Sequence, residues 1–206
     1  MKLKLNLFIQ ILSLAAFILL TALGRIQVWM FVFLGGVIGA VLFSRIYCGW
    51  ICPINTFTSV IDRMFGKFKI KRREVPLWFE RPFIRYSILI LFIGIMVFGL
   101  NTGKRIPVLP VLTVLGTVLT LIFVPSFWHR YLCPYGTVLN LPGKAAAHFL
   151  KVNSDNCIRC GICKKVCPGD AVKMKSKEVY PIIDKGLCLD CNACIKACPK
   201  KCIKYS

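Results

Sequence analysis

Two cysteine-rich runs near the end of this 206-residue chain constrain its fold more than any other feature. Each run has the spacing Cys-x2-Cys-x2-Cys-x3-Cys, and a proline follows directly, Pro168 in the first and Pro199 in the second. The runs lie 31 residues apart and contain Cys157, Cys160, Cys163, Cys167, Cys188, Cys191, Cys194 and Cys198. Three such thiolates on a tight loop can reach three corners of one metal–sulfur cubane, whereas the helical turn that follows carries the fourth away. The proline then ends that turn, because it cannot continue a hydrogen-bonded ladder.

Residues 153–206 resemble the two-cluster bacterial ferredoxins, in which this spacing holds two [4Fe–4S] clusters. The resemblance implies a small α+β domain with pseudo-twofold symmetry, short strands and helical turns. In that family the fourth cysteine of each run ligates the other cluster. The implied ligands are therefore Cys157, Cys160, Cys163 and Cys198 for the first cluster, and Cys188, Cys191, Cys194 and Cys167 for the second.

Zinc and disulfide bonds are the alternatives for these cysteines. Zinc ribbons usually take two Cys-x2-Cys pairs rather than two runs of four. Disulfide frameworks are typical of small secreted domains, not of a chain with a membrane anchor. We therefore expect clusters, and Cys202, which is left over, is expected to be a thiol without a ligand role.

Long apolar blocks dominate the rest of the chain and predict a membrane domain. Apolar residues make up 57% of the sequence, and they gather in blocks at 5–23, 28–43, 83–100 and 108–127. Because a membrane helix needs about 20 apolar residues, the first, third and fourth blocks are long enough. Arg85, at the edge of the third block, is expected to reach the membrane surface. The second block is short and rich in glycine, so it must include flanking residues or pack closely on a neighbour.

The predicted fold class is therefore a membrane α-helical domain with four transmembrane helices, joined to the ferredoxin-like domain. We expect the membrane domain over 1–143, a linker over 144–152 and the ferredoxin-like domain over 153–206. A cleaved signal peptide is the alternative for the first block, because Lys2 and Lys4 precede it. Its apolar run is longer than the roughly 7–15 residues of a signal sequence, which favours a retained helix.

The distribution of Lys and Arg predicts how the chain lies in the membrane. The link between the second and third blocks is strongly basic, including the run 67–73, whereas the links on the other side hold only Arg25, Lys104 and Arg105. Since Lys- and Arg-rich loops stay inside, both termini and the ferredoxin-like tail are expected on the cytoplasmic side of the cell membrane.

The net charge of +20 is consistent with that placement. Basic loops are attracted to anionic lipid, so the positive net charge does not require a nucleic-acid partner. The same loops are suited to docking an acidic redox partner, either a soluble donor or a subunit of a membrane oxidoreductase.

A second cysteine feature follows the second and fourth blocks. The segments Cys48-x3-Cys52-Pro and His129-x3-Cys133-Pro share a Cys-Pro-x-(Asn/Gly)-Thr core, which indicates an internal repeat of helix pairs. We expect the two halves to bring these cysteines together. Cys48, Cys52, Cys133 and His129 are then a candidate ligand set for a third iron–sulfur or metal centre, since imidazole replaces thiolate in Rieske centres. The alternative is that the cysteines are buried helix caps and that His129 lies in an interfacial aromatic belt.

With these features the chain resembles the NapH-like membrane ferredoxins over essentially its whole length. That family carries two Cys-x3-Cys-Pro motifs beside four spans and a two-cluster tail, and this chain departs from it where His129 replaces a cysteine. The resemblance implies transfer of single electrons between a cytoplasmic donor or acceptor and a membrane redox partner. The chain would then be an electron-transfer subunit rather than a complete enzyme.

Two alternative functions remain open from the sequence. The first is a quinol dehydrogenase component that binds a quinone between helices near Cys48 and Cys133. The second is a metal-handling or assembly accessory that uses Cys48, Cys52 and Cys133. A proton pump is disfavoured, because Asp62, Glu74 and Glu80, the acidic residues before the tail, all lie outside the apolar blocks.

Overall fold

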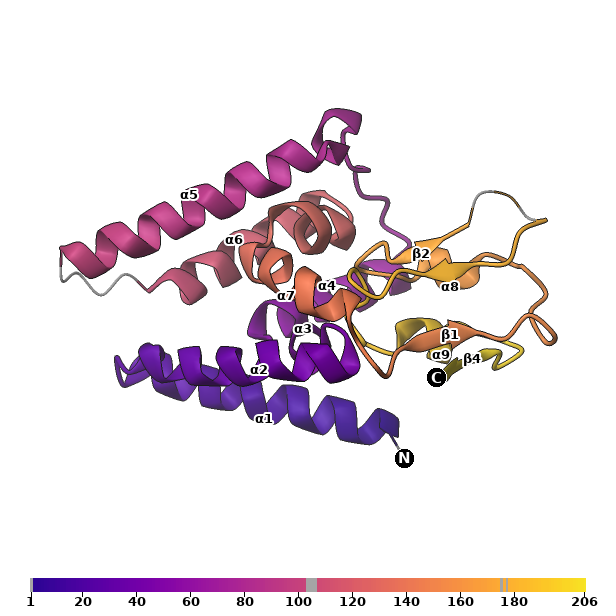
Figure 1. Ribbon diagram of the computed structural model, residues 1–206, viewed down its shortest axis with the longest axis horizontal. Coiled ribbons are helices and arrows are strands. Elements are labelled where there is room, and N and C mark those ends of the chain that lie inside the picture. The colour runs from indigo at the N-terminus through magenta and orange to yellow at the C-terminus, as the bar shows by residue number, and fades with distance from the viewer. Residues whose placement is uncertain (1, 103–106, 175, 177) are drawn as a thin grey trace.

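The structure is a computed structural model that describes residues 2–102, 107–174, 176 and 178–206. Lys104 and Arg105 lie outside these residues. The helices are α1 (Lys2–Ala22), α2 (Trp29–Phe43), α3 (Ile46–Trp50), α4 (Pro53–Lys67), α5 (Pro82–Asn101), α6 (Val108–Ile122), α7 (Pro134–Lys144), α8 (Ile162–Lys165) and α9 (Ala193–Ala197). Short 3-10 helices are η1 (Ile26–Val28) and η2 (Leu77–Glu80), and η3 (Phe127–Leu132) is a π-helix. The strands are β1 (Leu150–Val152), β2 (Val172–Lys173), β3 (Ile182–Ile183) and β4 (Ile203–Tyr205). The long helices form one end of the molecule and the tail forms the other (Figure 1).

Among the residues that the structure describes, two helical segments are long and apolar enough to cross a membrane. They are Leu5–Ala22 and Ile26–Phe43, each with a mean hydropathy of 2.2. The second includes the turn η1, which supplies the flanking residues that the short second block needed. Two further apolar helical segments, Phe83–Gly99 and Val108–Ile122, are shorter, so four spans stay a prediction.

The outer faces of the long helices carry large apolar side chains. The most exposed include Phe31, Ile38, Phe83 and Ile90, each at least 70% exposed. Soluble proteins rarely expose large apolar surfaces to water, whereas such surfaces are suited to contact with lipid. The inner faces are held by close contacts. A side chain on Gly36 of α2 would collide with the Tyr47 ring, which confirms the expected close packing of the second block.

The fourth apolar block ends its helix earlier than the sequence suggested, at Ile122 rather than Phe127. The backbone of Phe123 is extended, with φ −110° and ψ 163°. Arg73 pairs with this segment: its N–H donates to the Ile122 carbonyl at 3.0 Å, and its carbonyl accepts from Val124 at 3.1 Å. Pro125 then disfavours a return to helix in the residue before it.

Arg85, which was expected to reach the membrane surface, is half-buried and bonds inward to α7, and its level in a membrane stays a prediction. Its Nε donates to the Thr137 hydroxyl at 3.1 Å, and its Nη2 donates to the Gly136 carbonyl at 3.4 Å. These bonds join α5 to α7, two helices that are far apart in the sequence.

The tail is built from two similar halves. Strands β1 and β4 pair antiparallel, as do β2 and β3. Left-handed backbone conformations occur in pairs separated by the same 31 residues as the cysteine runs, at Arg159 and Asp190, Gly161 and Asn192, and Asp170 and Lys201. The repeat in sequence is therefore also a repeat in backbone conformation.

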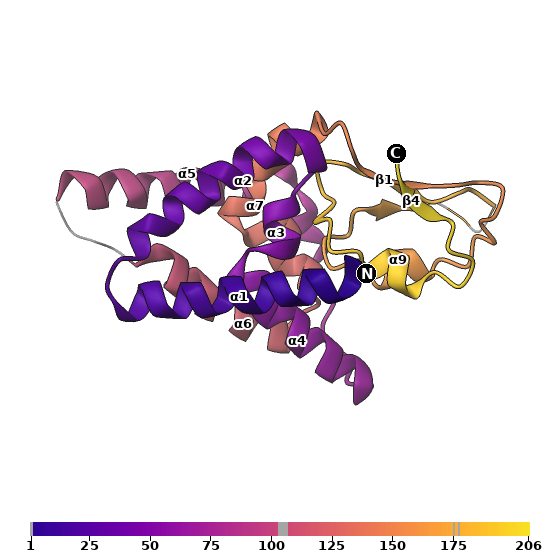
Figure 2. The same cartoon turned by 90° about the horizontal axis from the view of Figure 1, so that it is seen from below.

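The boundary between the helices and the tail differs in detail from the expected linker over 144–152. Leu150–Val152 forms β1, and Leu150 pairs with Tyr205 near the end of the chain. The tail thus includes the last residues of that range. The view from below in Figure 2 shows that the start of α1 lies beside α9, so the tail sits against the ends of the helices.

Candidate metal centres

The first predicted ligand set surrounds a small cavity in the tail. Cys157, Cys160 and Cys163 of the first run line it, together with Cys198 of the second run. The fourth ligand thus comes from the other cysteine run, as the ferredoxin resemblance implies. The fold therefore brings four thiols to one place, and the residues present fit a [4Fe–4S] cluster.

Cys202 lines the same cavity and is buried, with 4% of its surface exposed. Its Sγ lies 3.4 Å from the Sγ of Cys198. The position equivalent to Cys202 in the first half of the tail, 31 residues earlier, is Ala171. The first set thus has a fifth thiol beside it, whereas the equivalent position of the other half is an alanine. Sequence reasoning did not predict that proximity.

The second predicted set consists of Cys167, Cys188, Cys191 and Cys194. Burial, followed by the nearby Cys191 and Cys167, raises the pKa of Cys194 to about 12. Burial likewise raises the pKa of Cys191 to about 11, with Cys167 among the contributing neighbours. Burial also raises the pKa of Cys188, and Cys191 and Cys194 raise it further, so each of the four thiols interacts with others of the set. The residues present would fit a second cluster. Because iron binds thiolates, occupation of such a site releases protons.

Backbone N–H groups point at the sulfur atoms of the second set. Ala171 N–H donates to Cys167 Sγ at 3.3 Å. Donors of this kind stabilise negative charge on sulfur and are one of the means by which a protein sets a cluster's reduction potential.

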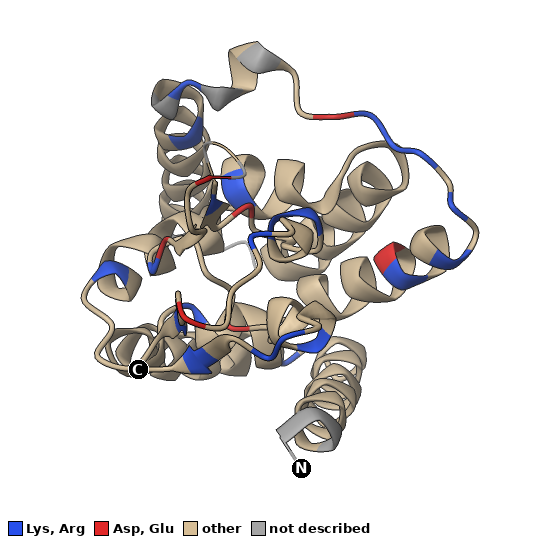
Figure 3. Ribbon diagram, turned by 90° about the vertical axis from the view of Figure 1, so that its right-hand side faces the viewer, with Lys and Arg blue, Asp and Glu red and all other residues tan. Residues whose placement is uncertain are grey.

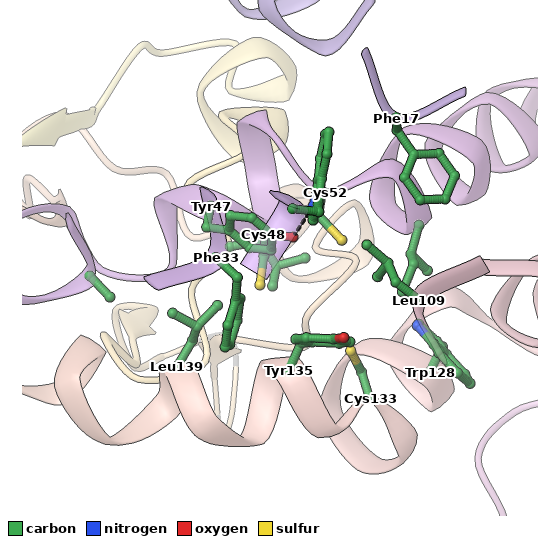
Figure 4. Packing of buried hydrophobic residues seen from close by; sticks show 14 residues of the cluster. Phe17, Phe33, Tyr47, Cys48, Cys52, Leu109, Trp128, Cys133, Tyr135 and Leu139 are labelled. Atoms are coloured by element: carbon green, nitrogen blue, oxygen red, sulfur yellow. Dashed lines mark hydrogen bonds between the residues drawn. The ribbon is translucent and has the colours of Figure 1, made fainter. Parts of the chain in front are cut away.

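The membrane-proximal cysteines also meet, in the core of the helical part (Figure 4). Cys52 and Cys133 cap the N-termini of α4 and α7, each directly before the proline that begins the helix. Cys48 comes from α3, and all three are at most 6% exposed. The repeated motifs therefore form equivalent helix starts, and the repeat places their cysteines in one cluster of buried side chains.

These cysteines do not form a site for a single metal ion. Within the described ranges, no three His, Cys, Asp or Glu side chains come close enough together to hold one ion. Burial, followed by Cys48, raises the pKa of Cys133 to about 12, and Gly136 N–H donates to its sulfur at 3.4 Å. Only the Cys133 thiol accepts a capping hydrogen bond, because Cys52 makes none and Cys48 lies inside α3. A third cluster at these cysteines stays a prediction.

His129 is buried in the protein core, so its side chain is not part of an exposed aromatic belt. It is 4% exposed, and the neighbouring Trp128 is 1% exposed. Its Nε2 lies 3.1 Å from the Thr58 hydroxyl of α4. Burial, followed by the charge of Arg45, lowers the pKa of His129 to about 3, so the imidazole is neutral.

Arg45 is a buried cation beside the membrane-proximal cysteines. It is 0% exposed, and its Nη2 donates to the His129 carbonyl at 3.3 Å and contacts Cys48 Sγ at 3.8 Å. Its Nε and Nη1 have no hydrogen-bond partner in the described part of the chain. A side chain on Gly136 would collide with the guanidinium. Sequence reasoning counted Arg45 only among the basic residues of the link between the second and third apolar blocks. Its position three residues before Cys48 was the available signal.

The helices and the tail meet where α3 packs on the loop that carries the second ligand set. Arg45 N–H donates to the Cys188 carbonyl at 3.3 Å, and Trp50 Nε1 donates to the Asp190 carbonyl at 3.0 Å. Gly49 lies so close to Leu189 that no side chain fits between them. The second candidate cluster site is therefore adjacent to the Cys48 motif.

Comparisons with known proteins agree with this arrangement. A family model described as a 4Fe-4S binding domain matches residues 25–73 and again 106–153, which confirms the internal repeat. A model described as a 4Fe-4S dicluster domain matches residues 150–205.

Three curated relatives resemble the chain. Over 152 residues it is 25% identical to the putative electron transport protein YccM of Escherichia coli K12, covering 63% of this chain and 43% of that protein. It is 28% identical over 145 residues to the ferredoxin-type protein NapH of Haemophilus influenzae, covering 63% and 49%. It is 29% identical over 144 residues to the methylamine utilization ferredoxin-type protein MauN of Methylorubrum extorquens, covering 60% and 47%.

The chain is a NapH-like ferredoxin-type protein. The two matching family models describe 4Fe-4S binding, and the relative YccM is described as a putative electron transport protein. The chain spans about half the length of these curated relatives.

Proposed function

We propose that this protein holds two [4Fe–4S] clusters at a membrane and passes single electrons between a cytoplasmic donor or acceptor and a membrane redox partner. The observation that supports this most strongly is the junction, where the loop with Cys188 and Cys191 packs on α3. A cluster bound there would be the part of the tail closest to the helices. When bound, such clusters supply one-electron redox chemistry.

The chain's own residues ligate the clusters, exclude water and set their electrostatic surroundings. We assign Cys157, Cys160, Cys163 and Cys198 to one cluster and Cys188, Cys191, Cys194 and Cys167 to the other. Buried apolar side chains pack against cysteines of both sets and limit the access of water, although Cys160 is exposed. They are Leu150, Ala171, Val172, Ile183, Leu187 and Ile203.

We further propose that four helices, α1, α2, α5 and α6, cross the cytoplasmic membrane. The exposed apolar faces of these helices and the weaker fit of a signal peptide support this. The tail and both termini would lie on the cytoplasmic side, where free thiols stay reduced. A reporter fused after Ser206 tests the orientation: it should be active only as a cytoplasmic fusion, and activity as an external fusion would reverse the topology.

The basic link between α4 and α5 is a suitable docking surface for an acidic redox partner. Lys67, Lys69, Lys71 and Arg73 are exposed, whereas Arg72 pairs with Asp62. Figure 3, which views the molecule from the tail end, shows this link as a run of basic residues at the edge of the molecule. Electrostatic steering by such a patch raises encounter rates at low salt.

Redox titration of the anaerobically purified full-length protein tests the proposed electron transfer. Two one-electron centres should appear by electron paramagnetic resonance, and an added membrane fraction should oxidise both. Cys188→Ala should remove one centre and slow oxidation of the other. A single centre in the wild type, or equal oxidation rates in the wild type and the variant, would contradict the proposed path through the second cluster.

A quinol dehydrogenase component is the second candidate, because an apolar cavity of about 300 Å³ lies between α5 and α6. Trp128 and Pro134 line it, and Pro134 directly follows Cys133. The indole N–H of Trp128 is buried and has no partner among the described residues. An apolar slot with few polar groups is what a quinone ring requires.

Filling this cavity distinguishes the two functions. Leu112 lines the cavity, whereas Leu121 is an exposed residue of the same helix outside it. If quinol reduces the tail clusters of the wild type, Leu112→Trp should abolish that reduction and Leu121→Trp should not. Failure of quinol to reduce the wild-type clusters would rule out this function for the isolated chain.

A further inference from the structure

A polar cavity of about 190 Å³ lies where α1, α4 and the tail meet. Asn6 and Gln10 of α1 line one side, Thr58 and Ser59 of α4 a second, and Cys191 the tail side. It is separate from the cavity between α5 and α6, and of the eight proposed ligand cysteines only Cys191 is among its described lining residues. Nothing in the electron-transfer function described above uses it.

Asn6 is the residue that most requires an explanation. Its side chain lines the cavity and is 2% exposed, yet its Nδ2 has no hydrogen-bond partner in the part of the chain that the structure describes. Leaving a buried amide donor unsatisfied costs about 1–3 kcal/mol. The two other amides at the cavity are already engaged, because Gln10 and Asn55 both donate to the Gly49 carbonyl, at 2.8 Å and 3.5 Å. Asn6 is thus an available donor.

The charged residues at the cavity favour an anion. Arg63 of α4 and Lys196 of α9 line it, and each interacts with the charge of the other. The single carboxylate among the described lining residues is Asp62, which is bound to Arg72. The Thr58 and Ser59 hydroxyls already donate to the Asn55 and Thr56 carbonyls, so they supply no further donor. A buried amide donor and two cations facing one space form a site that matches an oxyanion.

The depth of the cavity in the proposed membrane identifies the source of that anion. Asn6 lies at the start of the apolar segment Leu5–Ala22, at the end of α1 that touches the tail (Figure 2). In a membrane helix this position lies at the level of the lipid head groups. Anionic lipids are attracted to basic residues at this level of the cytoplasmic face.

We propose that this cavity binds a phosphate group, supplied by the head group of an anionic phospholipid. The lipid source rests on the membrane placement proposed above, whereas the phosphate chemistry does not. A phosphate held by Asn6, Arg63 and Lys196 bridges α1, α4 and α9. It therefore fastens the tail to the helices next to Cys191, a residue of the second ligand set.

Binding to the cluster-loaded, full-length protein in lipid-free detergent tests this. The probes are dioctanoyl phosphatidylglycerol, dioctanoylglycerol, which has the same chains without phosphate, and inorganic phosphate. Calorimetry should detect binding of phosphatidylglycerol and none of dioctanoylglycerol. If inorganic phosphate binds as tightly as phosphatidylglycerol and responds to the same variants, the phosphate site stands and its source is free phosphate.

Three variants locate the site. Asn6→Leu removes the buried donor, and Arg63→Gln removes an exposed cation without disturbing the core. Each should weaken phosphatidylglycerol binding at least about tenfold, equal to about 1.4 kcal/mol. Lys67→Gln is the matched control, because Lys67 is an exposed cation of the same helix that does not line the cavity. It should bind as the wild type does.

Three results would overturn the site: no binding of either phosphate probe to the wild type, equal binding by the wild type and the first two variants, or equal weakening by Lys67→Gln. Equal weakening by Lys67→Gln would show that binding depends on positive charge in general and not on this cavity. Iron content is measured on every sample. An unchanged content separates loss of this site from failure of the electron-transfer function.

Discussion

Gly49 of α3 packs directly against the carbonyl oxygen of Leu189, in the loop between Cys188 and Cys191. The backbone of the helical part therefore touches the backbone of the second cluster-binding loop with no side chain between them. Arg45 and Trp50, on either side, add hydrogen bonds to the same loop. This contact fixes how closely the tail approaches the helices.

Adding a methyl group at this contact should loosen the junction. Gly49→Ala should destabilise the protein by about 1–3 kcal/mol, because the methyl group forces the loop away. It should also slow electron exchange between the tail and a membrane acceptor, with iron content retained. Thermal unfolding and oxidation kinetics measure the two effects.

Gly66→Ala is the matched control for this junction. Gly66 lies in α4, and a methyl group there would meet nothing within 4 Å. Alanine in place of an exposed helical glycine is stabilising by up to about 1 kcal/mol. If Gly49→Ala behaves as Gly66→Ala does, the close contact with Leu189 is not formed in solution.

Because Cys202 lies beside Cys198, replacing Cys198 and replacing Cys167 should have unequal effects on iron content. In Cys198→Ala, Cys202 is placed to take over as a ligand, because the two sulfur atoms are 3.4 Å apart. In Cys167→Ala no thiol is available at the equivalent position, which is Ala171. Cys198→Ala should therefore keep most of its iron, and Cys167→Ala should lose about four irons per chain.

The double variant Cys198→Ala/Cys202→Ala is the control for that rescue. It should lose the first cluster, whereas Cys202→Ala alone should keep all of its iron. Iron loss in Cys198→Ala equal to that in the double variant would show that Cys202 does not replace Cys198.

Tyr47 stabilises the helical part through a buried hydrogen bond. Trp29 Nε1 donates to the Tyr47 hydroxyl at 2.8 Å, and both side chains are at most 4% exposed. Tyr47→Phe leaves the indole N–H unsatisfied, which should cost about 1–3 kcal/mol in the free energy of unfolding. Denaturation in detergent measures it. Tyr86→Phe, at a 55% exposed position, should cost nothing measurable, and equal costs would refute the account.

The tail could be predicted largely from sequence, because ligand spacing restricts the loops that carry the cysteines. The repeat of Cys48–Cys52 and His129–Cys133 was also visible, since a cysteine followed by proline marks the start of a helix. These features are local, because a few adjacent residues determine each of them.

The features that sequence did not predict depend on residues far apart in the chain. The early end of α6 arises from pairing with Arg73, about fifty residues away in sequence. The burial of Arg45 and of His129 depends on α7, α4 and the tail packing around them. The inward turn of Arg85 requires α7 as its partner. No local pattern identifies such partners.

The most direct test of two tail clusters is the content of iron and acid-labile sulfide per polypeptide, measured on full-length protein purified without oxygen. Four irons for each [4Fe–4S] cluster predict about eight irons and about eight sulfides. Cys191→Ala should lower both to about four. Zinc in place of iron, or iron without sulfide, would contradict the account, and about twelve irons would place a third cluster among the membrane-proximal cysteines.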